Sequence, residues 1–187
     1  MLRLRAAAKK EQETGRSQFG ESRRSALLHI QQDFTNLLKS DDYVIEFNKK
    51  PDGSDDLASF IVKIIVRRGP YATATIDFLF EIPDTYPIKP PKVHCKTLPL
   101  YHPNIDWEGN VCLNILREDH SSALDLSAFI AGLQFILQEP TSYDPLNKEV
   151  GADLERDPEQ YKRLVRDSLL GGVVNGRQYT RNPTFKE

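Results

Sequence analysis

The sequence is poor in cysteine and has no long apolar run. Its 187 residues include two cysteines, Cys95 and Cys112. Two cysteines are too few for a disulfide framework and cannot alone ligate a structural zinc. No apolar run approaches the ~18 residues that a membrane-spanning helix needs, and the first residues lack the apolar stretch of a signal peptide. We therefore expect free thiols, a cytoplasmic and nuclear location, and no membrane partner.

The formal net charge of -2 hides an uneven distribution. Residues 1–24 carry seven basic and three acidic residues, a sum of +4, so residues 25–187 sum to -6. Because residues 1–24 have little to bury, we expect a disordered basic extension followed by one domain over 25–187. The extension is either a solvated tail or a docking peptide, since Met1, Leu2 and Leu4 are apolar. A nucleic-acid partner is not expected, because the acidic domain would repel phosphate.

Hydrophobic periodicity predicts the first half of the fold. Apolar residues recur at helical spacing over about 23–39, which indicates an amphipathic helix. Four strand-like segments follow, and their short, turn-rich links favour an antiparallel meander. These segments are Tyr43–Phe47, Phe60–Val66, Thr75–Ile82 and Lys92–Cys95.

The second half begins with residues 96–125, which show no periodicity. A loop of this length inside a compact domain is usually functional. Beyond it, Asp144-Pro145 and Asp157-Pro158 each have the pattern of an N-cap followed by proline in the first helical turn. Three helices are expected, over about 126–137, 145–154 and 158–170. One helix, four strands, an irregular loop and three helices make an α+β fold.

Cys112 is the candidate nucleophile, because it lies in the irregular stretch among Asn, Gly, Pro and His residues. Cys95 lies on a predicted strand, where a cysteine is usually an inert buried thiol. His102 and Asn104 precede Cys112 by ten and eight residues, so a cysteine hydrolase is conceivable. No oxyanion-hole glycine motif follows Cys112, however. Apolar residues 113–116 also stand where the cradle of a cysteine phosphatase has glycines, so neither class is favoured.

Three separated motifs resemble the ubiquitin-conjugating (E2) enzyme family. His102-Pro103-Asn104, with Cys112 ten residues after the histidine, closely resembles the active-site signature of that family. Tyr86–Val93 is similar to its proline-rich segment before the fourth strand, and Trp107 falls in its loop before the active cysteine. The resemblance covers about 25–170 and implies the E2 (UBC) fold.

Finer details resemble the NEDD8-conjugating members of this family. The segments concerned are Met1–Leu4, Leu28–Asp33, Val111–Asp119 and Pro145–Glu149. The resemblance implies an enzyme that accepts NEDD8 from its E1 and transfers it to a substrate lysine with an E3. The alternatives are an E2 for ubiquitin and a catalytically idle E2-like adaptor. The presence of Cys112 argues against the adaptor, because idle variants typically lack the active cysteine.

The resemblance also implies roles for the residues of the signature. Cys112 would carry the modifier as a thioester. Asn104 would stabilise the oxyanion or brace the adjacent loop, and Asp144 would orient the incoming lysine or merely cap the next helix. His102 and Pro103 would shape the active-site turn. The E2 itself would need no metal or other cofactor, since ATP is consumed by the E1.

Two loops would bind a heterodimeric E1 and RING-type E3 partners. Ile88 matches the apolar position of the first loop, and the second includes His120, Ala123 and Leu124. Many family members have Trp where this chain has His120, so a large aromatic anchor is missing from the usual RING-binding surface.

The N-terminal extension would provide a further docking site. In the NEDD8-conjugating members it binds the E1 catalytic subunit, and its first residue enters a pocket of a co-E3. The expected docking residues are therefore Met1, Leu2 and Leu4.

Overall fold

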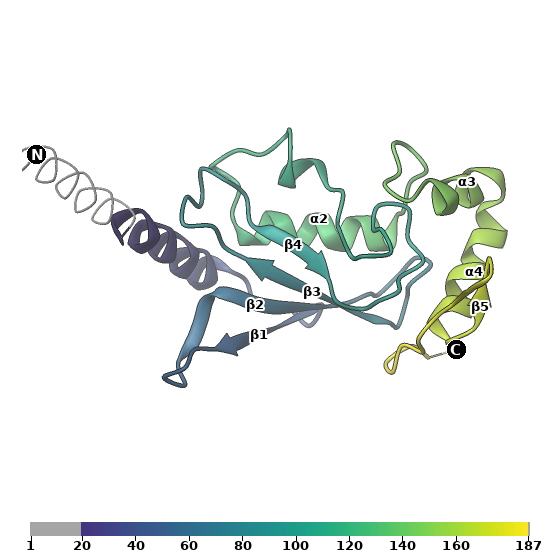
Figure 1. Ribbon diagram of the computed structural model, residues 1–187, viewed down its shortest axis with the longest axis horizontal. Helices are drawn as coiled ribbons and strands as arrows, with labels where there is room; N and C mark the ends of the chain where they lie inside the picture. The colour runs from purple at the N-terminus through teal and green to yellow at the C-terminus, as the bar shows by residue number, and fades with distance from the viewer. Residues whose placement is uncertain (1–19, 187) are drawn as a thin grey trace, which may run out of the picture.

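The computed structural model describes residues 20–186. In chain order its elements are a helix over residues 20–36, strands β1 (Tyr43–Lys49), β2 (Asp55–Ile65), β3 (Thr75–Glu81) and β4 (Lys92–Cys95), the 3-10 helix η1 (Asn114–Leu116), helices α2 (Leu126–Gln138), α3 (Lys148–Arg156) and α4 (Pro158–Leu169), and strands β5 (Val173–Val174) and β6 (Arg177–Gln178). The helix of residues 20–36 extends from one end of the sheet, and α3 and α4 gather at the other end (Figure 1). Among the described residues, no helix is both long and apolar enough to cross a bilayer.

The four long strands form the predicted antiparallel meander, in the order β1-β2-β3-β4. Successive side chains of a strand face opposite sides of a sheet, so alternate residues enter the core. Phe60 and Val62 of β2, and Phe78 and Phe80 of β3, are fully buried in this way. Helix α2 lies along one face of the sheet (Figure 1) and contributes buried side chains such as Phe129 to the same core. The predicted α+β class is confirmed.

Strand β2 begins at Asp55, five residues before the predicted start at 60. A tight turn returns the chain from β1, because Lys50 N–H donates to Ser54 O at 2.9 Å and Gly53 has a φ of +83°. Asp55 then pairs with Lys49 across the two strands. This polar beginning lacks the apolar alternation on which the prediction depended.

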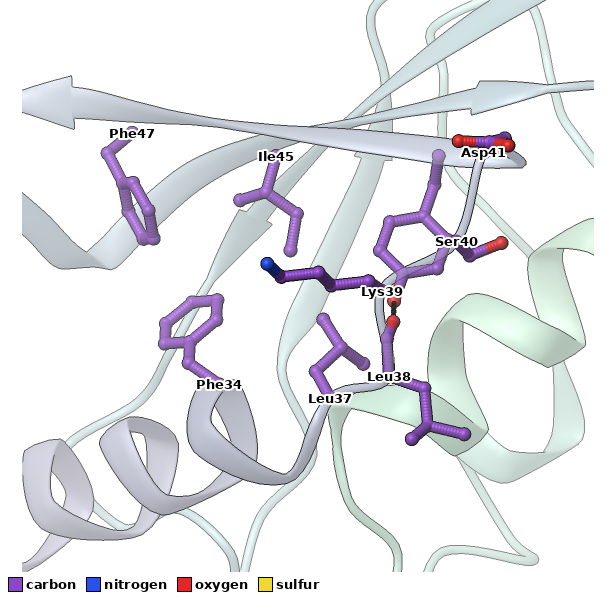
Figure 2. Close-up of a pocket in the computed structure, with 9 residues that line it drawn as sticks. Phe34, Leu37, Leu38, Lys39, Ser40, Asp41, Ile45 and Phe47 are labelled. Atoms are coloured by element: carbon purple, nitrogen blue, oxygen red, sulfur yellow. Dashed lines mark hydrogen bonds between the residues drawn. The ribbon is translucent and has the colours of Figure 1, made fainter.

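The N-terminal helix covers residues 20–36 rather than the predicted 23–39. Residues 20–24 are therefore helical, and the boundary predicted at residue 24 does not separate the helix from the extension. Leu37 and Leu38 leave the helix and lead into β1. Figure 2 shows Phe34 and Leu37 facing Ile45 and Phe47 across a hollow of about 620 Å³.

The C-terminal helices follow the predicted order, with one boundary wrong. Helix α4 starts after Asp157, whose carboxylate accepts hydrogen bonds from Glu159 N and Gln160 N, as predicted. Helix α3 starts only at Lys148, and its N-cap is Asn147 rather than Asp144.

Pro145 packs beside α3 instead of forming its first turn. A Cβ placed on Gly151 of this helix would lie 2.5 Å from Pro145 Cγ, so the proline ring packs against the side of the helix. Asp144 adopts a φ of +45°, a left-handed conformation that is not that of an N-cap residue.

The short β5–β6 hairpin was not predicted from the sequence. Its turn consists of Asn175 and Gly176, both at positive φ (50° and 76°). Asn-Gly at the two central positions of a turn is a strong hairpin signal, because both residues tolerate that conformation. This dipeptide in the printed sequence was the available clue.

Candidate active site

A small antiparallel hairpin places Asn104 and Cys112 opposite each other. Ile105 pairs with Val111, Asp106 N–H donates to Asn110 O at 3.1 Å, and Cys112 N–H donates to Asn104 O at 2.8 Å. This register makes Asn104 and Cys112 cross-strand neighbours, so their side chains leave the same face of the hairpin. The eight-residue spacing between them is therefore the spacing that this hairpin requires.

The turn of this hairpin is joined to the sheet edge. Asp106 Oδ1 accepts hydrogen bonds from Glu108 N and Asn110 N, and Cys95 N–H of β4 donates to Gly109 O at 2.8 Å. A Cβ on Gly109, whose φ is +95°, would lie 2.4 Å from Cys95 O. Glycine is thus required where the active-site hairpin meets β4.

His102 is a structural member of the site. It is fully buried; its Nδ1 accepts from Asn104 N–H and its Nε2 donates to Ile136 O, both at 2.9 Å. Burial lowers the pKa of His102 to about 4, although the bond to Ile136 O opposes this shift. A neutral imidazole with both nitrogens engaged cannot act as a proton shuttle.

The two thiols have different surroundings. Cys95 is fully buried, and burial raises its pKa to about 12, so this thiol is inert as predicted. Cys112 is half-buried and free of any disulfide. It lies on the face of the hairpin opposite the buried Ile105 and Val111.

The Asn104 side chain has an unusual hydrogen-bonding state. Only 7% of the residue is exposed, its Oδ1 is buried without a partner, and its Nδ2 bonds to none of the residues 20–186. An amide N–H₂ group beside the thiol can donate to an oxyanion formed there. Asn147, at the start of α3, donates its backbone N–H to Pro103 O at 2.8 Å and so fixes this turn to the helix.

Asp144 lies in the exposed segment between α2 and α3. Since Asn147 caps α3, the interpretation of Asp144 as an N-cap is wrong. The segment is tied to the active-site turn through Asn147 N–H and Pro103 O. Asp144 itself is exposed.

Trp107 is held by residues that sequence reasoning did not single out. The guanidinium carbon of Arg177, on β6, lies 4.2 Å from the centroid of the Trp107 ring, and Tyr179 meets the ring edge-on at 6.3 Å. A cation over an indole face is attracted by the ring quadrupole. The missed β5–β6 hairpin thus braces the active-site loop.

The two expected partner loops are joined to each other. Ile88 of the first loop is 78% exposed. His120 of the second loop is half-buried, and its Nε2 lies 2.9 Å from Pro87 O. The ring of His120 also stacks on Phe129 of α2 at 6.1 Å. His120 is therefore a bridge between the loops and not an exposed anchor.

The remaining predicted residues differ in their placement. Ala123 is exposed, whereas Leu124 packs against the core. Met1, Leu2 and Leu4 lie outside the described residues, so their docking role stays a prediction. Within residues 20–186, no group of three His, Cys, Asp or Glu side chains has an arrangement that could hold a metal ion.

Comparisons with known proteins agree with this geometry. The family model described as "Ubiquitin-conjugating enzyme" matches residues 29–169. The "NEDD8-conjugating enzyme ubc12" of Schizosaccharomyces pombe is 39% identical over 178 residues, which cover 94% of this chain and 96% of that protein. The "NEDD8-conjugating enzyme Ubc12" of Arabidopsis thaliana is 45% identical over 131 residues, which cover 70% of this chain and 71% of that protein.

A solved structure matches over almost the whole chain. The structure "S. cerevisiae Ubc12" matches with a TM-score of 0.79 at 35% sequence identity, and the match covers 96% of this chain and 98% of the chain of that structure. The chain belongs to the ubiquitin-conjugating enzyme family, whose members are E2 transferases that act through a thioester.

Proposed function

We propose that this chain is a NEDD8-conjugating E2 enzyme, with Cys112 as its thioester cysteine. The observation that carries the proposal is the near full-length match to relatives named as NEDD8-conjugating enzymes. A half-buried thiol beside a free amide, on a hairpin braced by β4 and α3, supports Cys112 as the reacting group.

The first step is a thioester exchange. The Cys112 thiolate attacks the thioester carbonyl that links the NEDD8 C-terminus to the E1, and the E1 thiolate leaves. One thioester is lost and one is formed, so the step is nearly isoenergetic. Positioning of the two thiols therefore supplies most of the acceleration.

The second step transfers the acyl group to a lysine of a protein substrate, of the cullin type in our proposal. The neutral lysine amine attacks the carbonyl and the Asn104 N–H₂ group donates to the oxyanion. The tetrahedral intermediate collapses as the Cys112 thiolate leaves, and the proton of the amine passes to solvent water. Asp144 would orient the lysine by accepting from its amine. The opposite charge would raise the pKa of a lysine and cannot by itself deprotonate it.

The site carries no strong general base, and this suits a thioester carrier. A base beside the thioester would also activate water and hydrolyse the intermediate. His102, the histidine of the active-site turn, is neutral, buried and engaged at both nitrogens. The geometry therefore favours aminolysis, in which the nucleophile is brought by the substrate.

The partners follow from this role. We propose that a heterodimeric E1 consumes the ATP, that a RING-type E3 and a co-E3 assist transfer, and that the enzyme acts in the cytoplasm and nucleus. The extension would bind the E1 through Met1, Leu2 and Leu4. Deleting residues 1–19 should slow charging by the E1 and leave the melting temperature unchanged; equal charging rates would contradict the docking role.

A charging assay tests the proposal. The protein is incubated with ATP and either the NEDD8 E1 with NEDD8 or the ubiquitin E1 with ubiquitin, and is analysed on non-reducing gels. We expect a thiol-sensitive adduct with NEDD8, a thiol-resistant oxyester with Cys112→Ser, and normal charging of Cys95→Ser. An adduct with ubiquitin alone would refute the NEDD8 assignment, and none with either modifier would favour the idle adaptor.

A further inference from the structure

Four buried side-chain polar atoms lack a hydrogen-bond partner within residues 20–186, and two of them belong to the active-site region. They are Oδ1 of Asn104, an acceptor, and Nδ2 of Asn147, a donor. The two residues are only 7% and 6% exposed. Buried polar groups are almost always hydrogen-bonded, because an unmade bond costs free energy, so these two atoms require an explanation.

Backbone hydrogen bonds hold both asparagines in fixed places. Asn104 donates its backbone N–H to His102 Nδ1 at 2.9 Å, and its carbonyl oxygen accepts from Cys112 N–H at 2.8 Å. Asn147 donates its backbone N–H to Pro103 O at 2.8 Å, and Pro103 directly precedes Asn104 in the chain. The start of α3 is therefore bonded to the residue next to Asn104.

The other two unpartnered atoms are Nδ1 of His120 and the hydroxyl of Tyr179. The Nε2 of His120 donates to Pro87 O, so its Nδ1 is an acceptor and cannot serve Asn104 Oδ1. The Tyr179 hydroxyl is a donor, but within residues 20–186 no hydrogen bond of Tyr179 reaches the active-site turn. Asn147 is thus the candidate donor that the described part of the chain bonds to that turn.

The N-cap of α3 uses only one end of the Asn147 side chain. Its Oδ1 accepts from Val150 N–H at 3.4 Å. Aspartate, serine and threonine also cap helices, since each has an oxygen that accepts from the first turn. Asparagine adds an amide N–H₂ group that a cap does not need. The cap therefore does not account for the buried donor.

A buried donor beside the active-site turn would decide which way the Asn104 amide faces. An amide has a donor end and an acceptor end. In the lysine transfer proposed above, on which this inference rests, the N–H₂ end must meet the oxyanion. A donor on the buried side favours the orientation with Oδ1 inward, which leaves the N–H₂ group for the thioester. An acceptor on that side would favour the opposite orientation.

We infer that Asn147 is a positioning residue, whose side-chain N–H₂ group donates to Asn104 Oδ1 directly or through one bound water. This link provides a partner for both buried atoms at once. It also keeps the N–H₂ group of Asn104 directed at the reacting carbonyl. Asn147 itself contacts neither the thioester nor the lysine, so its effect on the reaction passes through Asn104.

Single-turnover discharge to free lysine tests the inference. Each protein is charged, the E1 is removed, and loss of the thioester is followed over a range of lysine concentrations. Asn147→Ser keeps an N-cap, and Asn147→Asp keeps the cap while replacing the donor by an acceptor. We expect the maximal rate to fall about tenfold in Asn147→Ser and further in Asn147→Asp, with the half-saturating lysine concentration unchanged. The melting temperature of Asn147→Ser should change little.

Tyr179→Phe is the matched control, because it removes the other unpartnered buried donor and keeps the aromatic ring. It should discharge lysine at the wild-type rate. Wild-type rates in both Asn147 variants would overturn the inference. So would a slow Tyr179→Phe enzyme beside a normal Asn147→Ser enzyme, which would assign the donor to Tyr179.

A double-mutant cycle distinguishes positioning from a purely structural role. If Asn147 acts through Asn104, Asn147→Ser should cause no further loss of discharge in the Asn104→Ala background. A structural defect at the start of α3 would slow discharge in either background. Additive losses in the double variant would therefore overturn the inference.

Hydrogen exchange of the Asn147 side-chain N–H₂ protons, measured by NMR on the uncharged protein, tests the link without any activity. A wild type that does not charge would refute the proposed function and leave this measurement intact. Exchange should be about tenfold faster in Asn104→Ala, which removes the acceptor, and should stay slow in Asn104→Asp, which keeps an acceptor oxygen. Equal exchange rates in the wild type and both variants would overturn the inference.

Discussion

The buried state of His102 predicts a specific dependence of stability on pH. The imidazole is fully buried, and its Nδ1 accepts from Asn104 N–H, so a proton added there would break that bond. Burial lowers the pKa of His102 to about 4, against about 6.5 in an unfolded chain. At pH values between these two pKa values, His102 is therefore mostly protonated in the unfolded chain and mostly neutral in the folded protein.

The sign and size of the effect follow from linkage. Where the unfolded state binds more protons, stability rises with pH, so this contribution is complete above about pH 6.5 and is lost as the pH falls. With the two pKa values above, the free energy of unfolding falls by about 2 kcal/mol between pH 7 and pH 5. The total loss below pH 4 is about 3 kcal/mol.

Urea unfolding of the wild type and of His102→Gln at pH 7 and pH 5 measures this term. Gln does not titrate, so the difference in stability between the two proteins should shrink by about 2 kcal/mol at pH 5. An NMR titration of the folded wild type adds a second test, because the His102 ring should stay neutral, with the proton on Nε2, down to about pH 5. A folded-state pKa near 6.5, or an unchanged difference in stability, would refute the reasoning.

Three further predictions address the thiols, the hairpin turn and the acidic residue. Iodoacetamide at pH 8 should label Cys112 in the native protein and Cys95 only after unfolding, since with a pKa of about 12 roughly one Cys95 in ten thousand is ionised. Native labelling of Cys95, read by peptide mass spectrometry, would contradict its burial. Gly109→Ala should lower the free energy of unfolding by about 3 kcal/mol or more, because its Cβ would meet Cys95 O. Gly176→Ala is the control: it also has a positive φ but lies in open space, so it should cost about 1 kcal/mol. Similar urea midpoints for the two variants would argue against the clash. Asp144→Asn, which tolerates the φ of +45°, should slow discharge to lysine about tenfold and leave charging intact; an equal loss in both steps would indicate a purely structural residue.

The parts of the fold that the sequence predicted are those governed by periodicity. The alternation from Thr75 to Ile82 required one buried face, and Ile76, Phe78 and Phe80 are fully buried. The helical spacing from Leu126 likewise predicted α2 to within a residue at its end. Such patterns are read locally, because each buried face is set by the chain geometry of its own element.

The parts that the sequence misassigned depend on contacts between distant segments. Asp144-Pro145 has the local pattern of a helix start, but the proline ring packs on Gly151 and the helix begins after Asn147. From the sequence, His120 only marked the absence of the Trp that many family members have on the RING-binding surface. The fold brings its ring to the carbonyl oxygen of Pro87, 33 residues away in the chain. No periodicity reports a contact of this kind.

The active-site signature lies between these two cases. The eight-residue spacing between Asn104 and Cys112 can be read from the sequence. The reason for that spacing is a hairpin that hydrophobic periodicity does not predict. Ile105 and Val111 face the core, so Asn104 and Cys112, the residues beside them in the strands, share the opposite face of the hairpin, where Asn104 is buried and Cys112 is half-buried. The core thus determines where the thiol and the amide lie, and a shift of the register by one residue would bury the nucleophile and expose the isoleucine. A shallow site on an outer face can hold its reacting groups in place because apolar side chains on the inner face anchor the same two strands.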